Sequence, residues 1–417
     1  MLHALPLVFA LAGLALYTVL GGADLGAGFW QLTAMRGPDG ETVRQHAHRA
    51  MAPVWEANHV WLIFVLTVFW TAYPKAFGSI ASTLAVPLSI ALLGIVFRGA
   101  AYALREGART SREAGRIDTI FSISSILVPF ALGAAVGGIA ADRVPVGNAA
   151  GDLWSSWTGA TSIFVGVLAV ATSAYLAGVF LAADAARDGA HALERSFRRR
   201  ALASGVIAGA LAIAGLFVLH ADDQPLFHSL LSGRALPGVI VSGLAGIATL
   251  GLVHRRRYEL ARFGAALAVA AIIAGWTLAR WPTILPGLTV DQAAAGHDTL
   301  VWLIVVVLAG AVLLLPALAL LFRLTLAGRF RAPARAPSEG RTATRGSGNA
   351  RLLSRLAVIC AIAGTGLLNG AEADWAHGAG VVCLFVFVVL AFCAIAVPAL
   401  DAPDPVILFG DPRTHPQ

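Results

Sequence analysis

Charged residues are scarce in this sequence: 13% of its 417 residues are charged, 58% are hydrophobic, and the mean hydropathy is +0.77. Because soluble domains carry about 25% charged residues, this composition excludes an ordinary soluble domain. The apolar runs approach the roughly 20 residues that a helix needs to cross a bilayer. They lack the short alternating pattern of transmembrane β-strands. We therefore expect an all-α polytopic integral membrane protein.

Cysteines are few, and metal-binding motifs are missing. The three cysteines, Cys360, Cys383 and Cys393, lie in apolar runs, and no CxxC spacing occurs. A disulfide framework is therefore not indicated. The sequence has no HxxxH or CxxCH spacing, and its candidate histidines are scattered: His3, His59, His220, His228, His254, His297 and His377. We expect this chain to bind no metal and no haem.

Eleven apolar runs are candidate membrane spans. They cover residues 4–33, 52–72, 78–103, 118–141, 160–183, 201–220, 236–253, 261–280, 300–322, 352–369 and 377–399. The loops after odd-numbered spans hold 24 of the 30 basic residues, whereas the loops after even-numbered spans hold only Lys75, Arg143, Arg234 and Arg280. Because cytoplasmic loops are rich in Lys and Arg, this bias predicts an outside N-terminus and a cytoplasmic C-terminus. It also explains the net charge of +7 without a nucleic-acid partner.

One segment interrupts the hydrophobic pattern. Residues 326–350 are rich in Arg, Pro, Gly and Ser. Such a composition buries too little apolar surface to offset the entropy of ordering the chain, so we expect a disordered basic cytoplasmic linker. The linker separates a nine-span domain, residues 1–325, from a two-span C-terminal appendage, residues 351–400. A cytoplasmic tail, residues 401–417, follows.

Four ionisable residues lie within the first three spans: Asp24 in the first, Glu56 and His59 in the second, and Arg98 in the third. The predicted orientation places all four in the cytoplasmic half of the membrane. Glu56 and His59 are three residues apart and share a helix face. A charge inside hydrocarbon costs at least ~2.5–3.5 kcal/mol, so such groups are retained where they pair, line a wet cavity or move ions. These four residues are candidates for a proton pathway.

Other interpretations of the same residues stay open. Glu56 and Arg98 could form a structural ion pair while His59 satisfies a buried carbonyl. The chain as a whole could also be a purely structural membrane partner. A proton-coupled secondary transporter would also bury Asp, Glu, His and Arg in its spans. Transporters often show inverted repeats and paired broken helices, and neither pattern is visible in this sequence.

The segments around these residues resemble subunit II of the cytochrome bd-type quinol oxidases. Members of that family carry a DGFDLGVG-like motif in the first span, a PVW[DE]xNxxWL motif in the second and an FRGxAFEFR-like motif in the third. The corresponding segments here read GGADLGAG at 21–28, PVWEANHVWL at 53–62 and FRGAAYALR at 97–105. In addition, RWPTILPGLTVDQAAAG at 280–296 resembles the outer loop that precedes the last common span of the family.

The resemblance implies a fold and an activity. The nine-span core would consist of two four-helix bundles plus one helix, and the last two spans would be an extension outside that plan. The chain would be a non-haem subunit that pairs with a haem-bearing subunit I, which holds haems b and d. The complex, in the bacterial cytoplasmic membrane, would oxidise membrane quinol and reduce oxygen to water with protons from the cytoplasm. A structural quinone or a membrane lipid could accompany the chain.

The resemblance also implies roles for individual residues. Glu56 matches the acidic position of the family in the second span and would contribute to proton uptake together with the other three candidates. The supporting motif residues are Trp55, Asn58 and Trp61. Two positions depart from the family pattern. Gly21 replaces the first acid of the DGFD-like motif, so the first span offers one carboxylate to a relay, and His59 replaces a residue that is Glu in some members.

Overall fold

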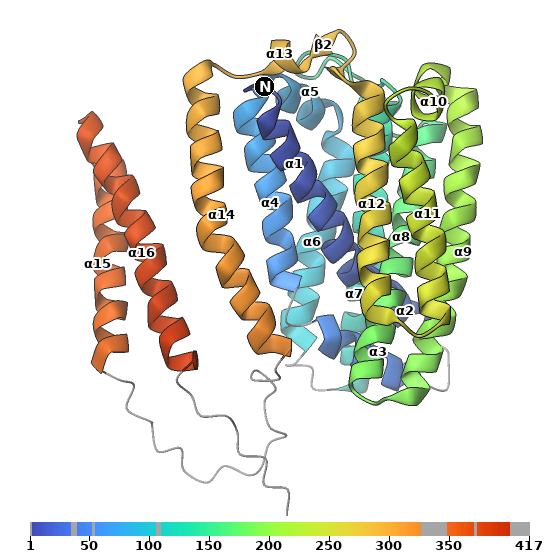
Figure 1. The fold of residues 1–417 in the computed structure, drawn as a ribbon, viewed down its shortest axis with the longest axis horizontal. Coiled ribbons are helices and arrows are strands. Elements are labelled where there is room, and N and C mark those ends of the chain that lie inside the picture. Colours follow the sequence, from blue (N-terminus) through green and yellow to red (C-terminus); the bar gives the residue numbers. More distant parts are fainter. Residues whose placement is uncertain are drawn as a thin grey trace, which may run out of the picture. The chain divides into compact units, whose positions relative to one another are not determined.

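The computed structural model describes residues 2–34, 40–51, 55–105, 110–326, 348–370 and 373–400 (Figure 1). Within the helices, the side chains of a few residues, Trp55 and Glu56 among them, also lie outside the description. Residues 327–347 are not described, so the predicted linker stays a prediction. The described chain divides into two compact units, Met1–Val306 and Val307–Gln417.

Nearly all of the described chain is helical. The first three apolar runs and the polar segment between the first two form α1 (Leu5–Leu16), η1 (Tyr17–Gly21), α2 (Gly22–Ala34), α3 (Gly40–Met51), α4 (Trp55–Ala72), α5 (Pro74–Thr83) and α6 (Ala85–Arg105). The middle of the chain forms α7 (Ser111–Ala140), α8 (Ala160–Arg187), α9 (His191–Asp222), α10 (Gln224–Leu231), α11 (Leu236–His254) and α12 (Tyr258–Arg280). The remaining elements are β1 (Thr283–Leu285), β2 (Leu288–Thr289), α13 (Val290–Ala293), α14 (His297–Leu326), α15 (Gly348–Gly370) and α16 (Asp374–Leu400).

The predicted all-α membrane fold is confirmed. Among the described residues, eight helices are long and apolar enough to cross a membrane, and three shorter apolar helices lie at 58–72, 352–364 and 378–391. Each expected span thus corresponds to a helix. Helices suit this environment because all their backbone hydrogen bonds are internal, so no polar backbone group faces hydrocarbon.

The third expected span, residues 78–103, is wrong at its start. The chain leaves helical geometry at Leu84, so residues 78–83 belong to α5 and the long helix α6 begins at Ala85. The physical reason is Pro87, which has no N–H to donate to a carbonyl in the preceding turn. When the helix restarts at Ala85, this proline falls in the first turn, where N–H groups have no intrahelical partner.

The short elements gather at the two ends of the first unit. Helices α5 and α13 and the β1–β2 hairpin lie at one end, and α3 lies at the other (Figure 1). The hairpin pairs Leu285 with Leu288 in antiparallel register. After α13, the N–H of Ala295 donates to the carbonyl of Ala72 at 2.8 Å, which ties this loop to the end of α4. Leu84 and Leu300 are buried in one apolar cluster with Leu285 and Leu288 of the hairpin.

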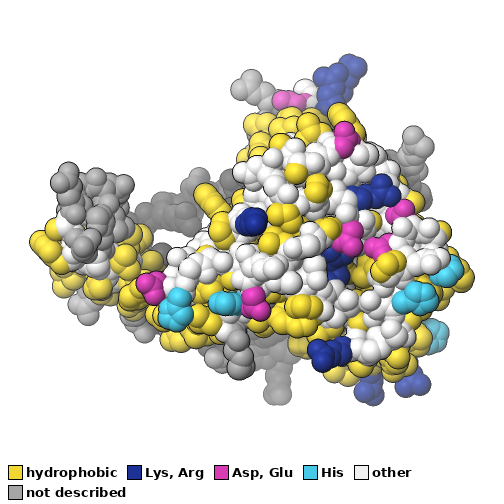
Figure 2. All heavy atoms as spheres, turned by 90° about the horizontal axis from the view of Figure 1, so that it is seen from above, with side chains coloured by type: hydrophobic (Ala, Val, Ile, Leu, Met, Phe, Trp, Pro, Cys, Tyr) yellow, Lys and Arg dark blue, Asp and Glu magenta, His cyan; other side chains and the backbone are white. Residues whose placement is uncertain are grey.

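Apolar side chains cover the lateral surface of the helices. Figure 2 looks down on the end that carries α5 and α13 and shows hydrophobic side chains around the sides, with acidic and histidine side chains on the end. His3, near the start of the chain, and Asp291 on α13 form an ion pair at 2.8 Å. Large apolar residues such as Phe217 and Phe263 are more than 70% exposed on the helix sides. This distribution is typical of a protein whose lateral surface faces lipid.

Small residues let the central helices approach closely. Helix α2 packs against both α7 and α8. A Cβ at Gly26 would lie 1.9 Å from the backbone oxygen of Ser173 on α8, and a Cβ at Gly28 would lie 2.3 Å from Ser125 on α7. Close backbone approach at small residues is a general feature of membrane helix packing. The two glycines place Asp24, on the same helix, beside its neighbours.

Gly26→Ala should therefore destabilise the protein by about 1–3 kcal/mol, because the added methyl group meets backbone rather than a side chain that can rotate away. The measurement is the thermal unfolding of the purified protein in detergent. Gly246→Ala is the matched control, since a Cβ at Gly246 meets nothing within 4 Å. Equal stability of the two variants would contradict this account of the contact between α2 and α8.

Candidate functional site

A buried ion pair joins the first and third spans. Both guanidinium ends of Arg98 on α6 donate to the carboxylate of Asp24 on α2: Nη1 to Oδ2 and Nη2 to Oδ1, each at 2.6 Å. Nη2 also donates to the backbone oxygen of Asp24 at 3.1 Å. Asp24 is 1% exposed and Arg98 is 2% exposed. This two-pronged geometry is the strong form of a charge-assisted hydrogen bond.

Helix α7 completes the surroundings of Arg98. The Nε of Arg98 donates to the hydroxyl of Ser125 on α7 at 2.9 Å. That hydroxyl donates in turn to the backbone oxygen of Phe121 at 2.7 Å. The guanidinium carbon lies 4.6 Å from the centre of the Phe121 ring, a distance typical of a cation–π contact. Arg98 thus bridges α2, α6 and α7.

The backbone changes geometry directly before Asp24. Residues Tyr17–Gly21 form one turn of π-helix between α1 and α2. Single π turns inside helices often mark functional sites. Here the turn presents the carbonyl of Leu20, which accepts a hydrogen bond of 3.2 Å from Nδ2 of Asn58 on α4. Asn58, one of the predicted motif residues, is 2% exposed and ties the second span to the first.

Tyr17 is a residue that the sequence analysis did not single out. It is 6% exposed and lies in the π turn, and its hydroxyl has no hydrogen-bond partner among the described residues. Its ring meets the imidazole of His59 edge-on, with the ring centres 6.5 Å apart. Tyr17 precedes Asp24 by seven residues, which is two helical turns. This spacing puts both residues on one face of a regular helix and could have identified Tyr17 from the sequence. Ser125 carried only a weaker signal, as a small polar residue in an apolar run.

The remaining predicted site residues, His59, Trp61, Trp55 and Glu56, all lie on α4. His59 is half-buried on α4, one residue after Asn58. Trp61 packs edge-on against Phe64, with the ring centres 6.3 Å apart. Trp55 and Glu56 lie in the first turn of α4, but their side chains fall outside the described residues. The proposed roles of these residues stay predictions.

The structure gives Arg98 a partner that the sequence analysis did not name, because both carboxylate oxygens of Asp24 bind its guanidinium. The partner considered from the sequence was Glu56, whose side chain lies outside the described residues, so that pairing stays a prediction. Sequence reasoning missed Asp24 as the partner because it did not include the direction of the side chains around the helix axes. Helical rise gives the depth of a residue to within a turn, but not the direction in which its side chain points. Asp24 and Arg98 share the depth that was predicted for them, and α2 and α6, the helices that carry them, both pack against α7.

The pair lies well inside the helix ends. Arg98 is seven residues from the end of α6, and Asp24 is ten residues from the end of α2. At a rise of 1.5 Å per residue, these positions are about 10 and 15 Å from those ends. Both ends lie on the side of the molecule that carries α3 (Figure 1). The ion pair therefore lies well inside the helical bundle. Tyr17 on the first span and Asn58 and His59 on the second are close by.

Ligands for a metal do not gather in the described part of the chain. No group of three or more His, Cys, Asp or Glu side chains there is arranged to hold a metal ion. The three cysteines are free, and each is half-buried. The chemistry that the described site supports is therefore electrostatic stabilisation and hydrogen bonding.

Comparison with known proteins points to one family. The family model described as "Cytochrome bd terminal oxidase subunit II" matches residues 2–325. Among curated proteins, "Cytochrome bd-I ubiquinol oxidase subunit 2" of Escherichia coli strain K12 is 28% identical over 123 residues, which are 30% of this chain and 32% of that protein. "Cytochrome bd ubiquinol oxidase subunit 2" of Bacillus subtilis strain 168 is 29% identical over 114 residues, 27% of this chain and 33% of that protein.

These alignments span about a third of the length of the curated relatives. A solved structure extends the likeness of the fold. A chain of the bd oxidase from Geobacillus thermodenitrificans superposes with a TM-score of 0.63 at 23% identity, covering 78% of this chain and 98% of that one.

The ion pair generates a direct test. Arg98→Met leaves a buried carboxylate without a counter-charge and should cost about 3–5 kcal/mol, seen as a loss of folded protein in the membrane. Asp24→Leu combined with Arg98→Met removes both charges and should restore much of that yield. Arg105→Met, on the same helix, breaks the partly exposed pair with Asp118 and should cost at most about 1 kcal/mol. A double variant no better than Arg98→Met would contradict the pairing.

Proposed function

The chain belongs to the family of cytochrome bd terminal oxidase subunit II, and on this basis we propose that it is a non-haem subunit that helps to supply protons for oxygen reduction. It acts beside a haem-bearing subunit I, and the complex oxidises membrane quinol and reduces oxygen to water. The complex belongs in the bacterial cytoplasmic membrane.

The observation that supports a role in proton supply is the buried polar cluster of the first three spans. The Asp24–Arg98 pair is held by two hydrogen bonds of 2.6 Å and is all but inaccessible to solvent. Such a pair is too tightly bound to be the mobile carrier, so it acts as a fixed electrostatic anchor. Glu56 and His59, on the neighbouring α4, are the groups that would take up and release the proton, because Glu and His commonly form proton relays in membranes.

The direction of uptake follows from the arginine bias. In the described part of the first unit, the α3 end carries many arginines, Arg105, Arg187 and Arg257 among them, and this end would be cytoplasmic by the positive-inside rule. Glu56 lies in the first turn of α4, near the same end. Protons would therefore enter from the cytoplasm, pass Glu56 and His59, and continue toward the partner subunit.

The substrate and the haems are assigned to the complex rather than to this chain. The names of the Escherichia coli and Bacillus subtilis relatives include ubiquinol. We extend a quinol substrate to the complex formed by this chain, and haems b and d to its partner.

A purely structural role is the second candidate, and one observation favours it. Arg98 donates four hydrogen bonds to Asp24 and Ser125, which neutralise and hold its charge without a mobile proton. In that case the polar cluster would serve only to align α2, α6 and α7 for docking of the partner.

The two candidates differ in the effect of Glu56→Gln. A relay predicts slower oxygen reduction per haem with normal assembly, because glutamine cannot carry the proton. Glu56→Asp should retain more activity, since it keeps a titratable carboxylate. Glu113→Gln, which changes an exposed acid at the start of α7, is the control. If turnover per haem in purified Glu56→Gln complex equals that of the wild type, the relay is excluded and the structural role stands.

Assembly with a partner is tested by spectroscopy. The chain purified alone should show no haem absorption, whereas co-expression with its subunit I should give a complex with reduced-minus-oxidised b and d bands. Stoichiometric haem on the isolated chain would overturn the assignment of both haems to the partner.

A further inference from the structure

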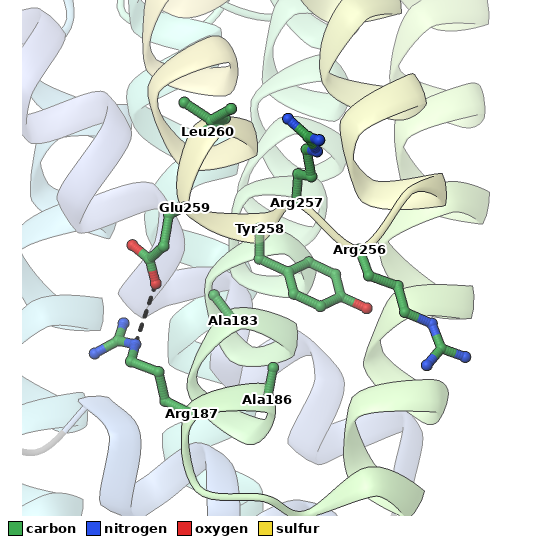
Figure 3. A pocket seen from close by; sticks show the side chains of 8 residues that line it. All are labelled: Ala183, Ala186, Arg187, Arg256, Arg257, Tyr258, Glu259 and Leu260. Atoms are coloured by element: carbon green, nitrogen blue, oxygen red, sulfur yellow. Dashed lines mark ion pairs between the residues drawn. The ribbon is translucent and has the colours of Figure 1, made fainter.

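A pocket of about 420 Å³ opens at the end of the first unit that carries α3, where α8 ends and α12 begins (Figure 3). It is lined by Ala183, Ala186, Arg187, Arg256, Arg257, Tyr258, Glu259 and Leu260. The proton pathway proposed above makes no use of this pocket, which lies between α8, α12 and the loop that joins α11 to α12.

The pocket has an excess of positive charge. Its lining holds three guanidinium groups and one carboxylate. Arg187 is paired with Glu259 at 3.2 Å, and the two side chains lie on one side of the Tyr258 ring (Figure 3). Arg256 lies on the other side and approaches Glu194 at 3.7 Å. In the described part of the chain, the exposed side chain of Arg257 forms no ion pair or hydrogen bond, so its charge is available to a ligand.

The backbone adds donors to the same wall. Helix α12 begins at Tyr258 without a side-chain cap, and its first backward hydrogen bond runs from the N–H of Ala261 to the carbonyl of Arg257. The preceding N–H groups have no acceptor within the helix, and they carry the partial positive charge of the helix start. The arginines and these amides line the pocket together.

The wall behind the pocket is firmly held. Tyr258 is 5% exposed, and its hydroxyl donates to Oε1 of Glu194 on α9. Arg262, one turn further along α12, donates to Oδ1 of Asp184 on α8 at 2.6 Å, and Asp184 also binds Arg187 at 2.8 Å. These contacts fix the start of α12 against α8 and α9. The positive wall is therefore built into the fold before any ligand binds.

An apolar stripe leads from the pocket along the membrane-facing side of α12. Leu260 lines the pocket and is 52% exposed, and Phe263 and Leu267 are 74% and 52% exposed. Their spacing of three and four residues puts them on one face of the helix. The stripe extends about 10 Å from the pocket toward the middle of the helix. A ligand with a phosphate at one end and hydrocarbon at the other fits both features.

We propose that this pocket binds the phosphate of an acidic phospholipid whose acyl chains lie along Leu260, Phe263 and Leu267. Arg257 and the free amides at the start of α12 hold the phosphate, and Arg187 and Arg256 contribute at the sides. Basic pockets between helices on the cytoplasmic side of membrane proteins are suited to such headgroups. The apolar stripe distinguishes a lipid from free inorganic phosphate.

The test uses the purified complex after removal of bound lipid by detergent. It is titrated with dioleoyl phosphatidylglycerol, with dioleoyl phosphatidylcholine and with inorganic phosphate, and bound ligand is counted by native mass spectrometry. The variant is Arg257→Gln. Arg255→Gln is the matched control, because Arg255 is exposed in the same loop and does not line the pocket. A second variant, Leu260→Ser with Phe263→Ser, interrupts the apolar stripe.

We expect the wild type and Arg255→Gln to bind phosphatidylglycerol in preference to phosphatidylcholine. Arg257→Gln should weaken phosphatidylglycerol binding about fivefold, the effect of one arginine near an anionic surface. The stripe variant should weaken it as well. Equal binding by Arg257→Gln and Arg255→Gln would overturn the site. Inorganic phosphate that displaces the lipid at equal concentration, with no loss in the stripe variant, would overturn its assignment to a lipid.

Discussion

The first three spans depend on one constraint: an ionised carboxylate buried among membrane helices has to meet a matched cation. Asp24 and Arg98 are each at most 2% exposed, and their contact is two-pronged. Removing one partner of a buried pair is far more damaging than removing both, so each residue makes the other necessary. Ser125 and Phe121 occupy the remaining faces of the guanidinium and bring α7 into the same assembly.

The packing around the pair follows from this constraint. Helix α2 lies close to α7, which carries Ser125, and to α8, and Gly26 and Gly28 leave out the side chains that would hold these helices apart. The π turn at Tyr17–Gly21 lies directly before α2, and the carbonyl of Leu20 in this turn accepts a hydrogen bond from Asn58. The second span is thereby joined to the first, through the hydrogen bond from Asn58 to Leu20 and the ring contact of His59 with Tyr17.

Much of this arrangement could be predicted from the sequence, and the reasons for the rest are physical. Apolar runs of about 20 residues located the helices, and the arginine bias with helical rise placed Asp24, His59 and Arg98 at similar depth. The partner of Arg98 was not predictable, because depth does not give the direction of a side chain. The π turn could not be recognised from the sequence, because one additional residue in a helical turn leaves the pattern of apolar residues in the run unchanged. The break at Leu84 did have a signal, in Pro87, which span-length reasoning alone does not use.

The central claim is that protons for oxygen reduction cross this subunit from the arginine-rich side by way of Glu56. The most direct measurement is proton uptake during a single turnover of the oxidase reconstituted in oriented vesicles, with a pH indicator on one side at a time. The account predicts uptake from the side that carries α3, and a rate of uptake that falls together with the rate of oxygen reduction when Glu56 is changed to Gln. Uptake from the opposite side, or at an unchanged rate in that variant, would contradict it.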